Sequence, residues 1–292
     1  MRLLLTGGSG QLGFEVQRLV APTIECVAPS RAELDFLAMS QEDIGDVVRT
    51  IRPTHILHGA AWTAVDAAEN DPASAHRVNV AGTRALAEAA AAIGARMLYV
   101  STDFVFGAGH DKPIATDAPH APLNVYGASK SEGEAAVREA LADASVILRT
   151  AWVYSAHGQN FVKTMLRLMR ERDTLNVVAD QIGTPTWANT LALGALALLQ
   201  QKASGDWHLT DAGTASWYDF AVAIYEEARA RGILEREVVI RPIGSADYPT
   251  PARRPHYSVL DKRETWASDV VPPVHWREQL RRALDEIVSA KS

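Results

Sequence analysis

The sequence has few of the features that would tie it to an oxidising compartment, a nucleic acid or a membrane. Cys26 is the only cysteine among 292 residues, so no internal disulfide can form, which fits a reducing compartment. The formal net charge of -6 argues against nucleic acid as a partner. The longest apolar stretch, Leu191 to Leu199, is too short to span a bilayer and predicts a core helix.

The N-terminal segment "MRLLLTGGSG" has only a three-leucine apolar run before its glycines, which does not make a signal peptide. We therefore expect a soluble, cytoplasmic protein with no membrane association. With 47% apolar residues, the chain is long enough to bury a large core in one large domain or two unequal ones.

Short apolar runs alternate with helical stretches in the first half of the chain. The strand candidates are Arg2 to Leu5, Ile24 to Val27, His55 to Leu57, Met97 to Val100 and Val146 to Leu148, and two of the helical stretches are Gln11 to Val20 and Ala73 to Ile93. This alternation predicts an α/β fold with a doubly wound parallel sheet. We expect a dinucleotide-binding, Rossmann-like domain over residues 1–150. Residues 151–292 are expected to form mainly a smaller substrate-binding domain, partly interleaved with the first.

Three glycines follow the first predicted strand and open the first predicted helix. Gly7, Gly10 and Gly13 would let the backbone turn sharply and approach a pyrophosphate, which the helix N-terminus then stabilises. Their spacing is three and three, whereas the commoner dehydrogenase fingerprint has two and then three. An ordinary tight turn is the alternative, but the position between strand and helix favours dinucleotide binding.

Tyr126 and Lys130 lie four residues apart on a predicted helix, just after a strand that ends at Thr102. On a helix this spacing places both side chains on one face. An ammonium close to a phenol would lower the pKa of the tyrosine from about 10 towards neutrality and make it a competent general acid or base. Thr102, at the rim where doubly wound sheets bind ligands, could bind a substrate carbonyl. Alone, such a pair is most often a solvated helix surface.

Taken together, these motifs resemble those of the extended short-chain dehydrogenase/reductases. More narrowly, the segments "STDFVF", "RTAWVY", "DQIGTPTWA" and "YPTPARRPHYSVLD" resemble the dTDP-4-dehydrorhamnose reductase family, and the resemblance runs from Met1 to about Asp261. It implies reduction of the 4-keto group of dTDP-4-dehydro-β-L-rhamnose to dTDP-L-rhamnose. Tyr126 would be the proton donor, Lys130 would bind the nicotinamide ribose, Thr102 would complete the triad, and Asp103 would adjust proton affinities.

The resemblance also implies binding residues. The cofactor positions are Gly7, Ser9, Gly10, Gln11, Leu12, Gly13, Asp35, Phe36, Ala61, Trp62, Thr63, Tyr126 and Lys130, to which the end of the second strand adds Ser30 and Arg31. The substrate positions are Thr102, Asp103, Tyr126, Trp152, Arg253 and Arg254. Asp35 could instead cap the next turn, and Trp152 could be a core aromatic. The two arginines, set between prolines, suit a diphosphate or could be surface charge.

The end of the second strand predicts a preference for NADPH, with NADH still usable. In NAD enzymes an acidic residue at this place binds the ribose 2′-hydroxyl, whereas an arginine accommodates the 2′-phosphate in NADP enzymes. Here the strand delivers Ser30 and Arg31, and no carboxylate is expected at its end. Asp35 follows a few residues later and could still bind a hydroxyl.

The expected assembly departs from that of some family members, which form dimers sharing a magnesium ion through glutamates. Glu15 matches the first of these positions, but Asn189 stands at the second. A neutral amide is a poorer ligand than a carboxylate for a hard cation. We therefore expect no metal site, no requirement for magnesium, and a monomer or weak homodimer.

Single residues argue against two rival functions. Sugar-nucleotide 4,6-dehydratases of the same superfamily carry Asp-Glu after the threonine, whereas this chain has Asp103 and Phe104, and a phenylalanine cannot transfer a proton. A non-catalytic dinucleotide-binding regulatory subunit commonly lacks the tyrosine or the lysine, and both are present here. The reductase, or another sugar-nucleotide reductase of the same superfamily, is therefore favoured.

Overall fold

The molecule is built on a central parallel sheet. The computed structural model describes residues 1–289, and its largest sheet has six strands in the order β10-β5-β4-β3-β1-β2, all paired in parallel. The strands are β1 (Arg2–Thr6), β2 (Glu25–Val27), β3 (His55–His58), β4 (Arg96–Thr102), β5 (Ser145–Thr150) and β10 (Gly205–His208). The first five coincide with the predicted strands, so the α/β class with a doubly wound parallel sheet is confirmed.

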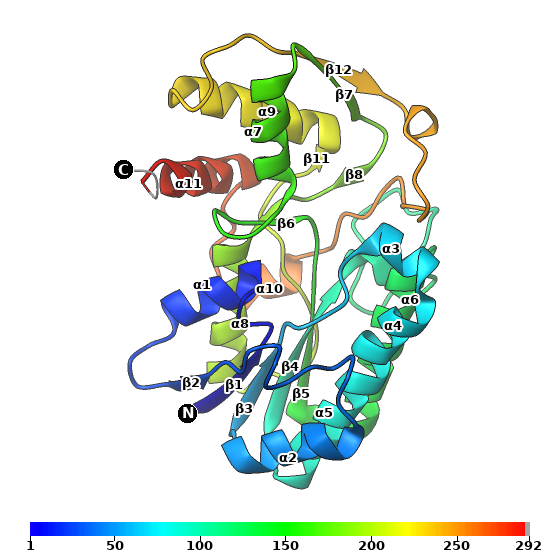
Figure 1. The fold of residues 1–292 in the computed structure, drawn as a ribbon, viewed down its shortest axis with the longest axis vertical. Helices are drawn as coiled ribbons and strands as arrows, with labels where there is room; N and C mark the ends of the chain where they lie inside the picture. Colours follow the sequence, from blue (N-terminus) through cyan, green and yellow to red (C-terminus); the bar gives the residue numbers. More distant parts are fainter. Residues whose placement is uncertain (290–292) are drawn as a thin grey trace.

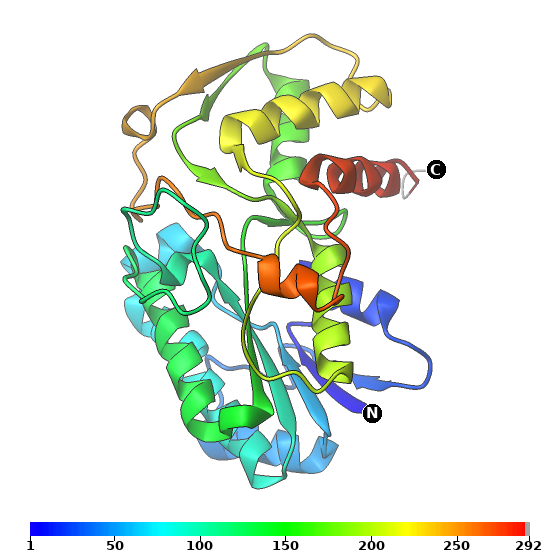
Figure 2. The same cartoon turned by 180° about the vertical axis from the view of Figure 1, so that it is seen from behind.

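Helices cover both faces of this sheet (Figures 1 and 2). One face carries α2 (Gln41–Ile51), α5 (Thr83–Ala92) and α6 (Val125–Leu141), and the other carries α1 (Gln11–Leu19) and α8 (Ala188–Gln200). Alternation along β1 divides its leucines between the two layers, because successive side chains of a strand point to opposite faces. Leu3 and Leu5 pack with α1 and α8, while Leu4 packs with α2 and α5.

The predicted core helix at Leu191 to Leu199 is confirmed as the greater part of α8. Most of its apolar side chains are buried against the sheet. No helix among the described residues is both long and apolar enough to cross a bilayer.

The long helical stretch predicted between β3 and β4 is interrupted by a π-helical turn. The predicted stretch, Ala73 to Ile93, corresponds to α4 (Pro72–His76), the π-helical segment η1 (Arg77–Gly82) and α5, and α3 (Val65–Asn70) precedes it. A π-helical turn holds an extra residue and is frequent at functional sites. Here it buries Asn79, whose side-chain oxygen accepts a hydrogen bond from the backbone N–H of Trp62 at 2.8 Å.

The second half of the chain builds a smaller layered unit above the sheet (Figure 1). Its helices are α7 (Phe161–Glu171), α9 (Trp217–Ala230) and α11 (Trp276–Ser289), whereas the short helix α10 (Arg263–Ala267) packs against β10 of the large sheet. Two-stranded pairs join β6 (Val153–Tyr154) to β9 (Thr186–Trp187), β7 (Thr174–Val178) to β12 (Val239–Ile243), and β8 (Ile182–Gly183) to β11 (Ala215–Ser216). Short 3-10 turns lie at η2 (Asp103–Val105), η3 (Ala142–Ala144) and η4 (Ser245–Asp247).

The chain returns to the large sheet after leaving it at residue 150. Helix α8 packs against α1, and β10 adds a strand beside β5, with Asp206 opposite Ile147. Residues of the second half therefore complete the sheet of the first. A division of domains at residues 150 and 151 stays a prediction.

A buried ion pair and its hydrogen bonds connect α6 to three strands of the large sheet, β4, β5 and β10. Glu134 of α6 is fully buried and accepts hydrogen bonds from the Arg149 guanidinium of β5 at 2.9 and 2.7 Å and from the Ser101 hydroxyl of β4 at 2.5 Å. Arg149 is 1% exposed and also bonds to Asp206 of β10 at 2.7 Å. Buried charges need such partners, because a charge that is left alone in the interior is strongly destabilising.

Candidate functional site

A cavity of about 1210 Å³ opens at the carboxyl edge of the sheet, where doubly wound folds bind ligands. Its walls come from the ends of β1, β3, β4 and β5, from the first turns of α1 and α6, and from the second half of the chain. Every residue predicted for the site lines this cavity, with the exception of Arg253. The sequence motifs therefore converge on one place.

The glycine loop forms a cradle whose shape depends on missing side chains. Gly7 has a φ of +73°, and a Cβ there would lie 2.8 Å from the backbone nitrogen of Ala60. A Cβ on Gly13 would lie 2.2 Å from the carbonyl oxygen of Gly7, so α1 can approach the loop only with glycine at this position. Gly10 is the N-cap of α1 and has no side chain to bond the first N–H groups of the helix. These groups and the open backbone fit a pyrophosphate.

Thr102 and Tyr126 meet at the base of the cavity. Thr102 ends β4, and its hydroxyl donates to Asp103 at 3.0 Å and accepts from the backbone N–H of Phe104 at 3.2 Å. Tyr126 lies in the first turn of α6, which is capped by the side chain of Asn124, and its ring packs edge-on against Phe104. The cap and the aromatic contact fix the direction in which the phenol points.

The expectation that Lys130 lowers the pKa of Tyr126 is wrong. Burial raises the pKa of Tyr126 above its ordinary value, and the Asp103 carboxylate raises it further, although a hydrogen bond with Thr102 acts in the other direction. The Lys130 ammonium donates to the carbonyl of Val100 at 2.7 Å and lies 3.8 Å above the Tyr99 ring. Among the described residues it does not bond to the Tyr126 hydroxyl. Tyr126 therefore keeps its proton at neutral pH.

Burial also moves the pKa values of two other ionisable groups towards neutral pH. The pKa of Lys130 is lowered from 10.5 to about 7 by burial, against which the charge of Glu134 acts. The pKa of Asp103 is raised from 3.8 to about 6, again by burial, although the hydroxyls of Ser258 and Thr102 oppose the change. Groups with pKa values moved towards the working pH are typical of sites that transfer protons.

Two carboxylates lie closer to the predicted cofactor positions after β2 than the sequence indicates. Arg31 is largely exposed, with its Nε 3.5 Å from the Asp35 carboxylate, which also accepts from the backbone N–H of Leu37 at 2.9 Å. The expectation that no carboxylate lies at the strand end is wrong, because Glu33 folds back and accepts from the backbone and hydroxyl of Ser30, both at 2.8 Å. Glu33 does not line the large cavity.

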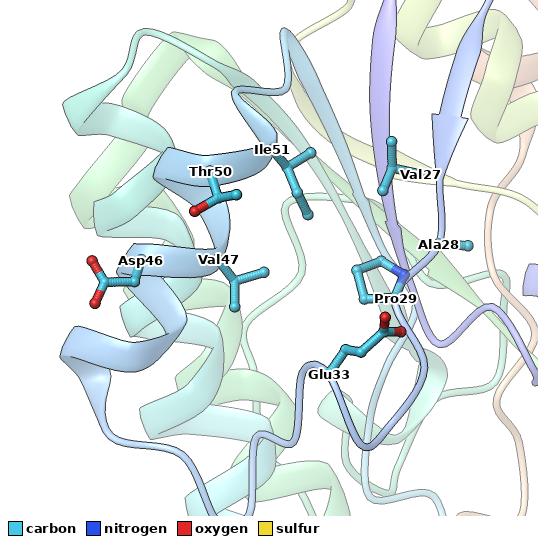
Figure 3. Close-up of a pocket in the computed structure, with 8 residues that line it drawn as sticks. All are labelled: Val27, Ala28, Pro29, Glu33, Asp46, Val47, Thr50 and Ile51. Carbon is cyan, nitrogen blue, oxygen red and sulfur yellow. The ribbon is translucent and has the colours of Figure 1, made fainter.

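Glu33 instead lines a second, smaller hollow of about 440 Å³ between α2 and the loop after β2. Figure 3 shows that Val47 and Ile51 of α2 point towards Val27 and Pro29 across it, while Asp46 points away. No residue predicted for the site lines this hollow. Its lining includes two carboxylates, Glu33 and Asp46, and no cation for a phosphate.

The two arginines of the "PTPARRP" segment have separate surroundings. Arg254 lines the cavity and forms a two-pronged ion pair with Asp66, at 3.0 and 2.7 Å. Arg253 is exposed and does not reach the cavity, and its backbone carbonyl accepts from Asn124 at 2.8 Å. Of the two arginines, only Arg254 lines the cavity, and the binding of a diphosphate by either of them stays a prediction.

The walls also contain residues that the sequence motifs did not include, among them Trp217 and Asn160. Trp217, the first residue of α9, stacks on Trp152 and lines the cavity. Asn160, the N-cap of α7, also lines the cavity and donates to the side chain of Gln11 at 2.9 Å. Helix-capping residues such as Asn160 can be identified in a sequence, but their contact with a loop about 150 residues away cannot.

Comparisons with known proteins agree with this geometry. The family model described as the RmlD substrate binding domain matches residues 1–289. A protein of Escherichia coli K12 named dTDP-4-dehydrorhamnose reductase is 41% identical over 98% of both chains. Crystal structures of such reductases from Clostridium acetobutylicum and Bacillus anthracis, the latter in complex with NADP, are 36% and 35% identical, with TM-scores of 0.92 and 0.91. Each covers 98% of this chain and 99% of the solved one.

The buried lysine predicts how stability changes with pH. Between about pH 7 and pH 10 the unfolded chain holds a proton on Lys130 that the folded chain has lost, so the free energy of unfolding rises with pH in this range. Relative to Lys130→Met, the wild type should gain on the order of 1 kcal/mol per pH unit. Urea unfolding of both proteins across this range measures the difference, with Lys112→Met as the control for loss of an exposed lysine. A difference that does not change with pH would contradict the assignment.

Proposed function

Because the chain belongs to the RmlD substrate-binding-domain family, we propose that it reduces the 4-keto group of dTDP-4-dehydro-β-L-rhamnose with NADPH, giving dTDP-L-rhamnose. The observation that carries the proposal is the meeting of the Thr102 and Tyr126 hydroxyls in the cavity that also holds the glycine loop. This arrangement supports the proposal, because a proton donor would then lie beside a dinucleotide cradle. A carbonyl reduction needs both.

The residues divide the work as follows. The N-terminus of α1 and the glycine loop hold the pyrophosphate, and Lys130 binds the nicotinamide ribose. When bound, the nicotinamide supplies the hydride that forms the new C–H bond at C4. When the substrate is bound, the Thr102 hydroxyl turns from Asp103 and donates to the 4-keto oxygen, which orients it. Tyr126 gives that oxygen its proton, so that the C=O π bond is replaced by one C–H and one O–H bond.

The environment of Phe104 supports reduction over dehydration. Removal of water from a sugar needs a further acid or base beside the threonine. Here that position holds the Phe104 ring, 5.8 Å from the ring of Tyr126, where it helps to bury the phenol. A buried, protonated tyrosine next to an apolar ring suits a reduction, in which the side chain supplies one proton and the cofactor supplies the hydride.

The first test is turnover by the wild type and by Tyr126→Phe. The purified protein should oxidise NADPH in the presence of dTDP-4-dehydro-β-L-rhamnose, with dTDP-L-rhamnose as the product. Tyr126→Phe keeps the packing against Phe104 and loses the proton, so kcat should fall about 10² to 10⁴-fold. Tyr248→Phe, at a tyrosine that is 62% exposed, is the matched control. A Tyr126→Phe enzyme within about threefold of wild type would rule out the proton donor.

Arg31 is proposed to bind the 2′-phosphate of NADPH. Arg31→Ala should lose roughly 1.5 to 3 kcal/mol of binding free energy with NADPH, as expected for hydrogen bonds to a charged group, and almost nothing with NADH. Glu33→Gln removes the neighbouring carboxylate and should keep or improve the affinity for NADPH. Steady-state kinetics with both cofactors measures this, and equal losses of kcat/KM with NADPH and NADH would mean that Arg31 supports only the loop.

We also propose that magnesium is not required and that the protein is a monomer or a weak homodimer. Glu15 is fully buried and already paired, because Arg18 donates to it at 2.6 Å and the amide of Asn189 at 3.1 Å. A carboxylate neutralised by its own helix has little charge left for a cation. Light scattering and activity should be the same with and without EDTA, whereas a dimer that dissociates on chelation would overturn this.

A further inference from the structure

Two tryptophans from distant parts of the chain stack on each other in the wall of the large cavity. The rings of Trp152 and Trp217 lie 3.5 Å apart and are nearly parallel, at 7°. Trp152 follows β5, and Trp217 opens α9 directly after its capping residue Ser216. Both line the cavity, so the stack joins the edge of the large sheet to the upper unit.

The position of the Trp152 ring is fixed from more than one side. Its backbone has a φ of +47°, a left-handed conformation that is uncommon for a residue with a Cβ and persists only where the surroundings impose it. Gly183 lies so close that a Cβ there would be 2.6 to 2.8 Å from indole atoms of Trp152. In the β8–β11 pair Gly183 is opposite Ala215, two residues before Trp217. The same short sheet thus brings both neighbours to Trp152.

This clamped ring lies next to the reacting groups. Thr150 pairs with Thr102 in the β5–β4 register, and Trp152 follows two residues later at the same edge of the sheet. A 6-deoxy sugar has a methyl group and C–H bonds that pack against aromatic surfaces. A flat indole beneath the sugar would exclude water from one side of the sugar ring. The sugar ring is the part of the proposed substrate that must be placed beside Thr102 and Tyr126.

We propose that Trp217 is a positioning residue that holds the Trp152 indole where it packs against the sugar ring of the substrate. The inference rests on the proposed function for the identity of the sugar nucleotide. Trp217 acts through Trp152, so its loss should affect recognition of the sugar and leave recognition of the nucleotide unchanged.

Calorimetry on the cofactor-free protein tests this without turnover, because no hydride acceptor is then present. Trp217→Leu should raise the Kd of dTDP-L-rhamnose about tenfold, equivalent to 1.4 kcal/mol, and change the Kd of dTDP less than about twofold. Trp217→Phe keeps an aromatic ring and should recover most of the affinity. Trp207→Leu, at a tryptophan of β10 outside the cavity, is the matched control.

Gly183→Ala provides a second, independent variant in case Trp217→Leu does not fold. It leaves Trp217 intact and forces the Trp152 ring to move, so it should show the same selective loss for the sugar nucleotide. Equal weakening of dTDP and dTDP-L-rhamnose, or an unchanged Kd for both, would overturn the inference. A wild type that binds dTDP-L-rhamnose and does not reduce the keto sugar would instead refute the proposed function and leave the role of Trp217 standing.

Discussion

The buried ion pair between Glu134 and Arg149 is the interaction on which the site depends. It connects α6, which carries Tyr126 and Lys130, to β4 through Ser101 and to β5 and β10 through Arg149 and Asp206. Taking both charges out of water is costly, and the cost is offset only because their hydrogen bonds are nearly all satisfied. The pair thus fixes α6 against the edge of the sheet at the place where a small shift would separate Tyr126 from Thr102.

The same low-polarity surroundings set the protonation of the site. Burial is the largest cause of every large pKa shift around the cavity: it raises the pKa values of Tyr126 and Asp103 and lowers those of Lys130 and His58, the last to about 3. His58 can remain neutral because the hydroxyls of Thr6 and Thr83 bond to its two ring nitrogens, at 2.6 and 3.0 Å. The walls of the cavity therefore carry little net charge. When a dinucleotide is bound, its own charges would be the largest in the cavity.

Local patterns in the sequence predict the sheet and most of the site, because these follow from short-range rules. The strand ending at Thr102 is an apolar run, and Gly7 to Gly13 and Tyr126 to Lys130 are spacings within single elements. What the sequence does not indicate depends on packing over long separations. Trp217 stacks on Trp152 across 65 positions of the chain, and the β8–β11 pair helps to bring the two together. Arg254 lines the cavity and Arg253 does not, which their adjacent places in the sequence do not indicate. Burial reverses the expected effect of Lys130 on Tyr126.

The return of the chain to the sheet through α8 and β10 limits how such a protein can change its specificity. The segment that supplies Trp152 and the segment that supplies Trp217 are separated by a helix and a strand that complete the dinucleotide-binding core. The upper unit therefore cannot be exchanged as a cassette between relatives without also removing part of the sheet. New sugar specificities on this scaffold must arise by point substitutions and loop changes around the cavity.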